Sequence, residues 1–138
     1  MNDRVFLDTN IIIYLYSKFE ADKRNVAYDI VNKFNCFIST QTMNEAVNIW
    51  FKKYQLTQDI ILKYLDELET VCEKVMIIHR DTINRALEIK IRYGFTFYDC
   101  LILSSSIEAD CGILFSEDMN DGQIINGILK ISNPFKGI

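Results

Sequence analysis

Four carboxylic acids that lie far apart in the chain are the side chains best suited to act together. Each lies close to the end of a short apolar run or at the start of a helical one. They are Asp8, Glu45, Asp99 and Asp118. Carboxylates that share one cavity repel each other and stay ionised only when cations neutralise them. Oxygen ligands without His or Cys favour hard cations, so the set predicts Mg²⁺ or Mn²⁺ and hydrolysis of a phosphate ester.

The first two acids also have simpler structural explanations. Asp8 directly follows the apolar run 5–7, at the carboxyl end of a predicted strand, where ligand sites of open α/β sheets lie. It is equally suited to be the N-cap of a helix beginning near Ile11. Glu45 stands three residues after Thr42, which is the spacing of a capping box. Taken alone, capping is the better explanation of Glu45.

Capping explains Asp99 less well. It follows Thr96 at capping-box spacing, but it opens the segment 97–107, which is apolar on nearly every side. Such a helix is buried, and a buried carboxylate costs several kcal/mol or is neutralised unless something compensates it. A metal ion is one such partner.

The last acid has two neighbours that could replace it. Asp118 follows the apolar run 113–115, and Glu117 and Asp121 lie in the same loop. Gly122 indicates a turn, so a hydrophilic turn is the simpler explanation. We expect one of the three acids to face the end of the sheet. Asp118 is the choice by position, and Glu117 and Asp121 are the alternatives.

The elements that must position these acids alternate along the chain. Five short apolar runs predict buried strands, at residues 5–7, 36–38, 75–78, 113–115 and 128–131. Apolar stripes of helical period lie between them, in residues 42–54, 58–75 and 81–93. This alternation predicts a single α/β domain over residues 1–138, a three-layer α/β/α sandwich with a central, mainly parallel five-stranded sheet.

The composition is that of an ordinary globular protein, with 49% hydrophobic and 25% charged residues. The four cysteines form no CxxC pair, and we expect buried thiols in a reducing compartment. Residues 1–10 do not have the pattern of a signal peptide, and no apolar run has membrane-spanning length. The sequence therefore predicts a cytoplasmic protein with no membrane partner. The net charge of −4 argues against a general nucleic-acid binder but not against a metal-dependent nuclease.

The sequence resembles the PIN-domain family, and in particular the VapC-type toxins of toxin–antitoxin pairs. The resemblance covers essentially the whole chain, and its specificity lies in the order and spacing of four short motifs. They are Leu7-Asp8-Thr9-Asn10, Asn44-Glu45, Tyr98-Asp99-Cys100-Leu101-Ile102, and the segment from Leu114 to Gly122 that contains Ser116-Glu117-Asp118.

The resemblance implies a site and an activity. Asp8, Glu45, Asp99 and Asp118 match the family's acidic quartet, which binds Mg²⁺ or Mn²⁺ and cleaves single-stranded RNA with metal-activated water. Asn10 and Ser116 match polar positions that orient the acids, and Glu117 and Asp121 are further supporting candidates. The family commonly forms homodimers and is often silenced by a small antitoxin protein.

Other functions remain open at this stage. Aspartyl-phosphate chemistry is weak, because Asn10 occupies the place where phosphatases of the haloacid-dehalogenase type have a second acid. A housekeeping RNA-processing nuclease of the same family is a closer alternative. A non-catalytic scaffold that binds RNA or protein is the alternative from another class. His79 has no evident partner and is better explained as structural or surface-lying, and the pair Lys52-Lys53 as plain solvated charge.

Overall fold

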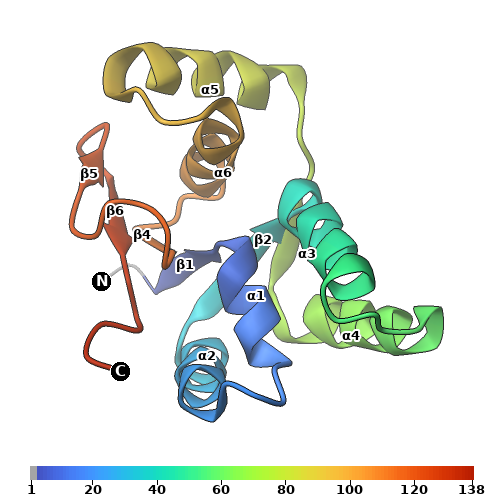
Figure 1. The fold of residues 1–138 in the computed structure, drawn as a ribbon. Helices are drawn as coiled ribbons and strands as arrows, with labels where there is room; N and C mark the ends of the chain where they lie inside the picture. Colours follow the sequence, from blue (N-terminus) through green and yellow to red (C-terminus); the bar gives the residue numbers. More distant parts are fainter. Residues whose placement is uncertain (1–2) are drawn as a thin grey trace.

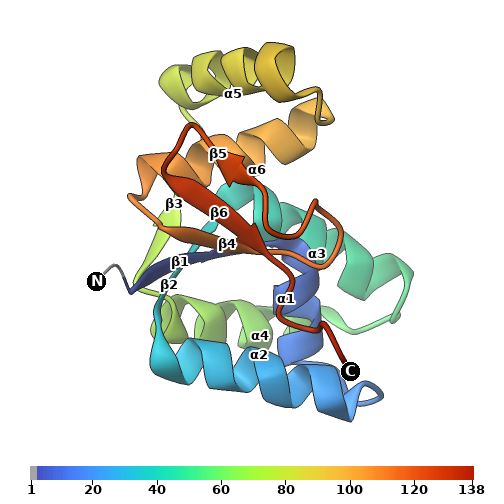
Figure 2. The same cartoon turned by 90° about the vertical axis from the view of Figure 1, so that its left-hand side faces the viewer.

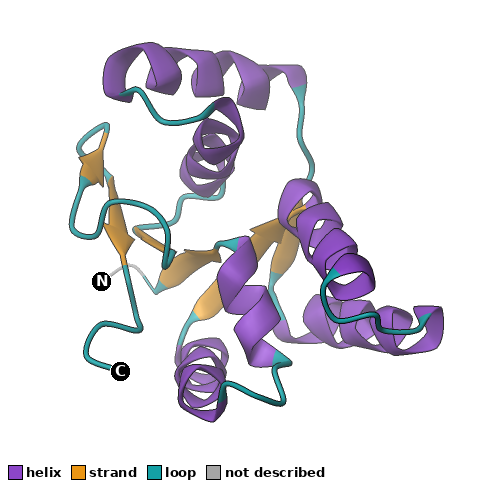
Figure 3. Cartoon of the chain, in the orientation of Figure 1, coloured by secondary structure: helices purple, strands orange, loops and turns teal. Residues whose placement is uncertain are grey.

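The computed structural model describes residues 3–138, which form one sheet with helices on both of its faces (Figures 1 and 3). The strands are β1 (Arg4–Leu7), β2 (Asn35–Ser39), β3 (Lys74–Met76), β4 (Ile113–Phe115), β5 (Ile124–Ile125) and β6 (Leu129–Ser132). Their order across the sheet is β3-β2-β1-β4-β6-β5. All neighbouring strands pair in parallel except β5, which is antiparallel to β6.

The predicted number of strands was one too low. The additional strand, β5, has only two residues and lies at the edge of the sheet. Ile124 is exposed and Ile125 is buried, so the segment has too few residues to show an alternating pattern in the sequence. The other five strands lie within one or two residues of the predicted runs.

The helices divide between the two faces of the sheet, as Figure 2 shows. They are α1 (Thr9–Leu15), α2 (Ala21–Lys33), α3 (Thr40–Lys52), α4 (Gln58–Val71), α5 (Arg80–Tyr93) and α6 (Phe97–Glu108). The first four pack on one face, and α5 and α6 pack together on the other. The predicted α/β/α sandwich is therefore confirmed.

Strand β1 shows why the sheet is buried on both sides. Val5 and Leu7 belong to the core under α1–α4, whereas Phe6 belongs to the core under α5 and α6. All three side chains are fully buried. Side chains alternate between the two faces of a strand, so an unbroken apolar run is what a central strand requires.

Helix α6 is the buried helix that the sequence predicted. Every residue from Cys100 to Ser106 is buried. The hydroxyl of Ser104 donates to the Thr82 carbonyl oxygen of α5 at 2.8 Å, and that of Ser106 donates to the Ile102 carbonyl oxygen at 2.8 Å. Ser104 and Ser106 thus satisfy their own polar groups, whereas the buried hydroxyl of Ser105 has no hydrogen-bond partner among the described residues.

The cysteines agree with the prediction of buried thiols. Cys36, Cys72, Cys100 and Cys111 are all free and buried. Within residues 3–138, none of the helices combines the length and the hydropathy that crossing a bilayer requires.

Candidate functional site

Asp8 lies at the carboxyl end of the central part of the sheet. It follows β1, which is flanked by β2 and β4, and its backbone N–H donates to the Phe115 carbonyl oxygen at 3.0 Å. It is also the N-cap of α1, because Oδ1 accepts from the Thr9 N–H at 2.7 Å. The two explanations that the sequence left open are compatible, since one oxygen caps the helix. Only 6% of the residue is exposed.

Ser116 fixes the second oxygen of Asp8. Its hydroxyl donates to Asp8 Oδ2 at 2.7 Å and accepts from the backbone N–H groups of Asp118 and Met119, both at 3.3 Å. Ser116 is itself fully buried. One hydroxyl therefore ties the loop after β4 to the end of β1.

Asn10 holds the same loop from α1. Its Nδ2 donates to Asp118 Oδ2 at 3.1 Å, and its Oδ1 accepts from the backbone N–H of Glu117 at 3.3 Å. The amide side chain of Asn10 thus uses its donor and its acceptor to bind Asp118 and Glu117, which are neighbours in the sequence. The arrangement gives Asn10 and Ser116 the orienting contacts that the family resemblance implied for them.

Glu45 is not part of a helix cap. The N-cap of α3 is Ser39, and Thr42 occupies the third helical position, so the proposed capping box of Thr42 and Glu45 is wrong. Glu45 instead lies further along the helix, where its Oε1 accepts from the Thr9 hydroxyl at 2.6 Å. Gln41 Nε2 approaches its other oxygen at 3.4 Å. Ser39 and Thr42 form the capping box, about one turn earlier than the sequence suggested. The carboxylate of Glu45 is therefore not used for capping and lies at the site.

Asp99 approaches from the opposite face of the sheet, on the first turn of α6. Thr96 is the N-cap, and its hydroxyl accepts from the backbone N–H of Asp99 at 3.3 Å, as the capping-box spacing predicted. The carboxyl group is half-buried. Burial raises its pKa above the ordinary value, and the nearby charges of Glu45 and Asp118 raise it further.

The three acids after β4 point in different directions. Glu117 accepts from the Tyr14 hydroxyl at 2.7 Å and forms an ion pair with Lys23, which lowers its pKa. Asp121 accepts from the Asn133 N–H at 2.7 Å and from Lys136 Nζ at 2.8 Å. Asp118 is exposed and lines the same pocket as Asp8, and Glu117 also lines it although its carboxylate binds Lys23 and Tyr14.

We therefore expect different outcomes for two substitutions in this loop. Asp118→Asn should reduce phosphodiester cleavage at least about tenfold, because it removes a charge from the acidic pocket. Asp121→Asn should leave the rate within about twofold, because its carboxylate binds the C-terminal segment instead. The measurement is the initial rate of cleavage of one fluorescent oligoribonucleotide at matched enzyme concentration. Equal losses in both variants would contradict the assignment.

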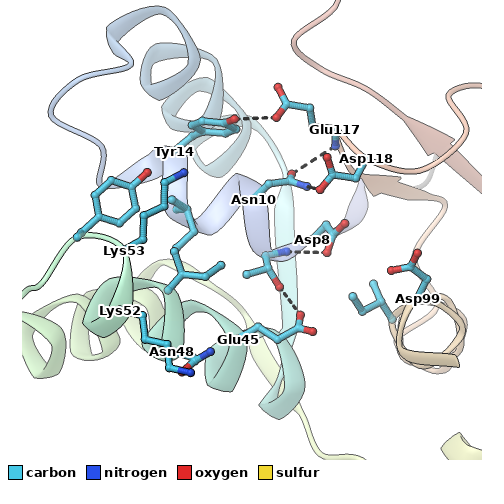
Figure 4. Close-up of a pocket in the computed structure, with 15 residues that line it drawn as sticks. Asp8, Asn10, Tyr14, Glu45, Asn48, Lys52, Lys53, Asp99, Glu117 and Asp118 are labelled. Atoms are coloured by element: carbon cyan, nitrogen blue, oxygen red, sulfur yellow. Dashed lines mark hydrogen bonds between the residues drawn. The ribbon is translucent and has the colours of Figure 1, made fainter. Parts of the chain in front are cut away.

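The four acids line one open pocket of about 740 Å³, which we call the acidic pocket. Figure 4 shows the carboxylates of Asp8, Glu45, Asp99 and Asp118 pointing toward one another across it. Burial raises the pKa of Asp8 to about 6, although its hydrogen bonds with Ser116 and Thr9 act in the opposite direction. The charges of Asp99 and Glu45 add to the increase. Like charges are thus concentrated in a partly desolvated space.

The donor set fits a hydrated hard cation. Within the described part of the chain, no three Asp, Glu, His or Cys side chains lie close enough together to hold a metal ion directly. Mg²⁺ dehydrates reluctantly and usually binds through one or two carboxylates while it keeps several waters, so a wider ring of acids suits it. Burial and the neighbouring acids raise the pKa of Asp8 and of Asp99, and a bound cation would favour the ionised form of both.

The sequence left the role of the basic side of the pocket open. Lys52, Lys53 and Asn48 from the end of α3 line it on the side away from Asp99 (Figure 4). Their position on a helical stripe beginning at Glu45 was visible, but a solvated surface was an equally good explanation. His79 lies elsewhere, just before α5, where its backbone N–H donates to the Thr82 hydroxyl at 3.1 Å.

These observations define a class of protein, an α/β/α sandwich with an acidic pocket at the carboxyl ends of its parallel strands. Residues 5–120 match the model of the PIN domain family. The match covers most of the 138 residues, and the chain belongs to that family. A comparison with curated proteins finds no match.

Solved structures of toxin–antitoxin systems have the same fold. The toxin–antitoxin complex from Klebsiella pneumoniae superposes with a TM-score of 0.69 at 22% identity, covering 95% of this chain and 98% of the other. VapBC2 from Rickettsia felis, bound to a promoter DNA fragment, gives 0.66 at 16% identity, covering 94% and 99%. VapC20 of Mycobacterium tuberculosis, a toxin that cleaves the sarcin–ricin loop, gives 0.65 at 16% identity, covering 83% and 91%. At these identities the likeness establishes the fold.

Proposed function

We propose that this protein is a metal-dependent endoribonuclease that cleaves single-stranded RNA, and that it acts as the toxin of a toxin–antitoxin pair. The observation that carries the proposal is the convergence of Asp8, Glu45, Asp99 and Asp118 on one pocket. They come from four separate parts of the chain, and no requirement of folding would gather like charges there. Membership of the PIN family supports the same activity.

In this proposal Asp8 and its neighbours form a prearranged anionic site. Thr9 and Ser116 each fix one oxygen of Asp8, Thr9 also holds Glu45, and Asn10 holds Asp118. Fixed carboxylates need no reorganisation when substrate arrives, which is how such sites accelerate reactions. Bound Mg²⁺ or Mn²⁺ would supply Lewis-acid polarisation of the phosphate and a more acidic water.

The remaining lining residues suit the substrate's phosphates. Lys52 and Lys53 are exposed and lie on the side of the pocket away from Asp99. Ammonium groups there would bind the phosphates that flank the scissile bond, while the acids occupy the reacting centre. This division explains how a chain with a net charge of −4 can bind RNA locally.

The toxin role rests on the structural neighbours, two of which are complexes from toxin–antitoxin systems. We propose a small antitoxin protein as partner and a homodimer as the working form. A housekeeping RNA-processing nuclease, or a scaffold that binds RNA or protein without cleaving, is the alternative. A small reading frame beside the gene would favour the toxin.

Removal of divalent metal tests the activity. The purified protein should cleave an unstructured oligoribonucleotide with Mg²⁺ or Mn²⁺, and EDTA should abolish cleavage because four uncompensated carboxylates then face the phosphate. Excess metal added back should restore the rate, which excludes damage by the chelator. The readout is the product ladder on a denaturing gel. Cleavage at an unchanged rate in EDTA would reject the metal-dependent mechanism, and RNA binding without cleavage under any metal would favour the scaffold.

A further inference from the structure

A second, smaller pocket adjoins the acidic pocket and is walled by aromatic rings. It has a volume of about 240 Å³, and its lining comes from the end of α1, the loop after it, α3, the loop after α3, and α4. Figure 1 shows where these elements lie. We call it the aromatic pocket. Its rings are those of Tyr16, Phe19, Trp50, Tyr54 and Tyr64.

Three of these rings form a rigid wall. Tyr16 and Tyr64 are stacked, with centroids 4.4 Å apart and an interplanar angle of 18°. Trp50 meets both of them edge-on, at 5.9 Å and 5.2 Å. Trp50 is buried, whereas the two tyrosines are half-buried and so reach the pocket surface. A prearranged aromatic wall can bind a flat ring without ordering itself first.

Phe19 lies on the rim and is 86% exposed. Leaving so large an apolar side chain in water forgoes the gain of burying it, and a bound planar group would cover it.

The two pockets are neighbours that share two lining residues. Ile13 and Tyr54 line both of them. Lys53, which lines the acidic pocket, places its Nζ 5.5 Å from the centroid of the Tyr54 ring. Lys18 lines the aromatic pocket itself. An RNA strand with one phosphate in the acidic pocket can therefore contact aromatic rings and lysine ammonium groups with its neighbouring nucleotide.

We infer that the aromatic pocket binds one base of the RNA substrate, next to the nucleotide whose phosphodiester bond lies among the four acids. This rests on the proposed function, because it identifies an additional subsite for the same substrate. Stacking on aromatic rings combined with cationic groups along the backbone is the general way in which proteins bind single strands. The volume is below the roughly 300–1,000 Å³ of sites for drug-sized ligands, so it suits one ring system.

The occupant could in principle be an apolar side chain of a partner protein. Lys18 in the lining of the aromatic pocket, Lys53 near its Tyr54 ring, and its position beside the proposed site of phosphate cleavage favour a nucleotide.

Tryptophan fluorescence can report occupation of the pocket directly, because Trp50 is the only tryptophan in the chain. Asp8→Asn protein, which should bind without cutting, is titrated with an oligoribonucleotide that the wild type cleaves. We expect saturable quenching. The same oligonucleotide is then tested with one base removed. It should still quench Trp50 fluorescence when the abasic residue lies far from the cleavage site, and it should not quench when the abasic residue lies at one position beside that site. Quenching that does not depend on the abasic position would overturn the inference.

A variant of the exposed rim residue gives an independent test. Phe19→Ala should weaken binding of the intact oligonucleotide at least about fivefold, since one stacked base is lost, and should have little effect on binding of the abasic one. Tyr28→Ala is the matched control, because Tyr28 is 58% exposed and lies outside both pockets. Equal effects of Phe19→Ala on both oligonucleotides would overturn the subsite.

The outcomes separate this inference from the proposed function. If the wild type cleaves RNA and abasic substitution has no effect at any position, the nuclease stands and the base subsite fails. If the wild type cleaves no RNA with either metal, the proposed function fails. The titration is then run with an unstructured oligoribonucleotide that carries the abasic residue at each position in turn, and it still measures whether a base occupies the pocket. Quenching by a partner peptide but not by RNA would overturn the inference and assign the pocket to protein binding.

Discussion

Replacing Asp8 by asparagine is expected to reduce RNA cleavage by at least about 100-fold. Asp8 is the most buried of the four acids and has the raised pKa of about 6. Neutralising it removes the charge that holds a cation at the end of β1. The stabilisation of transition-state charge by a metal ion is worth several kcal/mol, and each 1.4 kcal/mol corresponds to a tenfold change in rate.

The substitution should leave the fold intact, which makes the activity loss interpretable. Asparagine has nearly the same shape, and its oxygen can still accept from the Thr9 N–H that caps α1. The rate is measured with saturating Mn²⁺ or Mg²⁺, and circular dichroism checks the fold. Asp121→Asn is the control, because it removes an acid of the neighbouring loop that is bonded to Asn133 and Lys136 instead. Cleavage by Asp8→Asn at the wild-type rate would refute the site.

The second large effect concerns the stability of the metal-free protein as a function of pH. The pKa of Asp8 is raised from 3.8 to about 6 on folding, mainly by burial. The unfolded state therefore loses its proton at lower pH than the folded state. The stability associated with Asp8 is fully present below about pH 4 and is lost as the pH rises to about 6. The difference is about 2.2 pKa units, or about 3 kcal/mol, since the group is buried and little screened.

This dependence is isolated by comparing two proteins. The free energy of unfolding is measured by urea denaturation in EDTA from pH 4 to pH 7, for wild type and for Asp8→Asn. Other acids titrate in both proteins, so their contributions cancel in the difference. The variant should gain up to about 3 kcal/mol relative to wild type as the pH rises from about 4 to above 6. Parallel curves would show that the buried carboxyl group of Asp8 is not costly to ionise.

The opposite pH dependence is expected to remain in both proteins from Glu117. Its ion pair with Lys23 and its hydrogen bond from Tyr14 lower its pKa. These contacts therefore stabilise the fold at pH values above the ordinary pKa of a glutamate, and the stabilisation is lost on acidification. The comparison with Asp8→Asn is therefore needed, because the wild-type curve alone mixes two opposite slopes.

The sequence determined the layers of the fold. An unbroken apolar run such as residues 5–7 is buried on both faces only when helices cover both sides of the sheet. The segments with apolar stripes of helical period form those helices. The sequence also determined that Asp8 and Asp118 lie at one edge, because successive parallel strands end on the same side. Helix α2 was not predicted, since only Ala27 and Ile30 of it are buried and its apolar stripe is correspondingly weak.

Tertiary structure alone decided which polar groups meet at that edge. Glu45 contacts Thr9 because Ser39, and not Thr42, is the N-cap of α3. The two candidate N-cap positions are less than one helical turn apart. The directions of Glu117 and Asp121 after β4 depend on Lys23, Tyr14 and Lys136, which lie at least fifteen residues away from their partners. Local patterns fix backbone conformation and burial because these depend on near neighbours. Side-chain direction in a loop is set by partners that only the folded chain brings into contact.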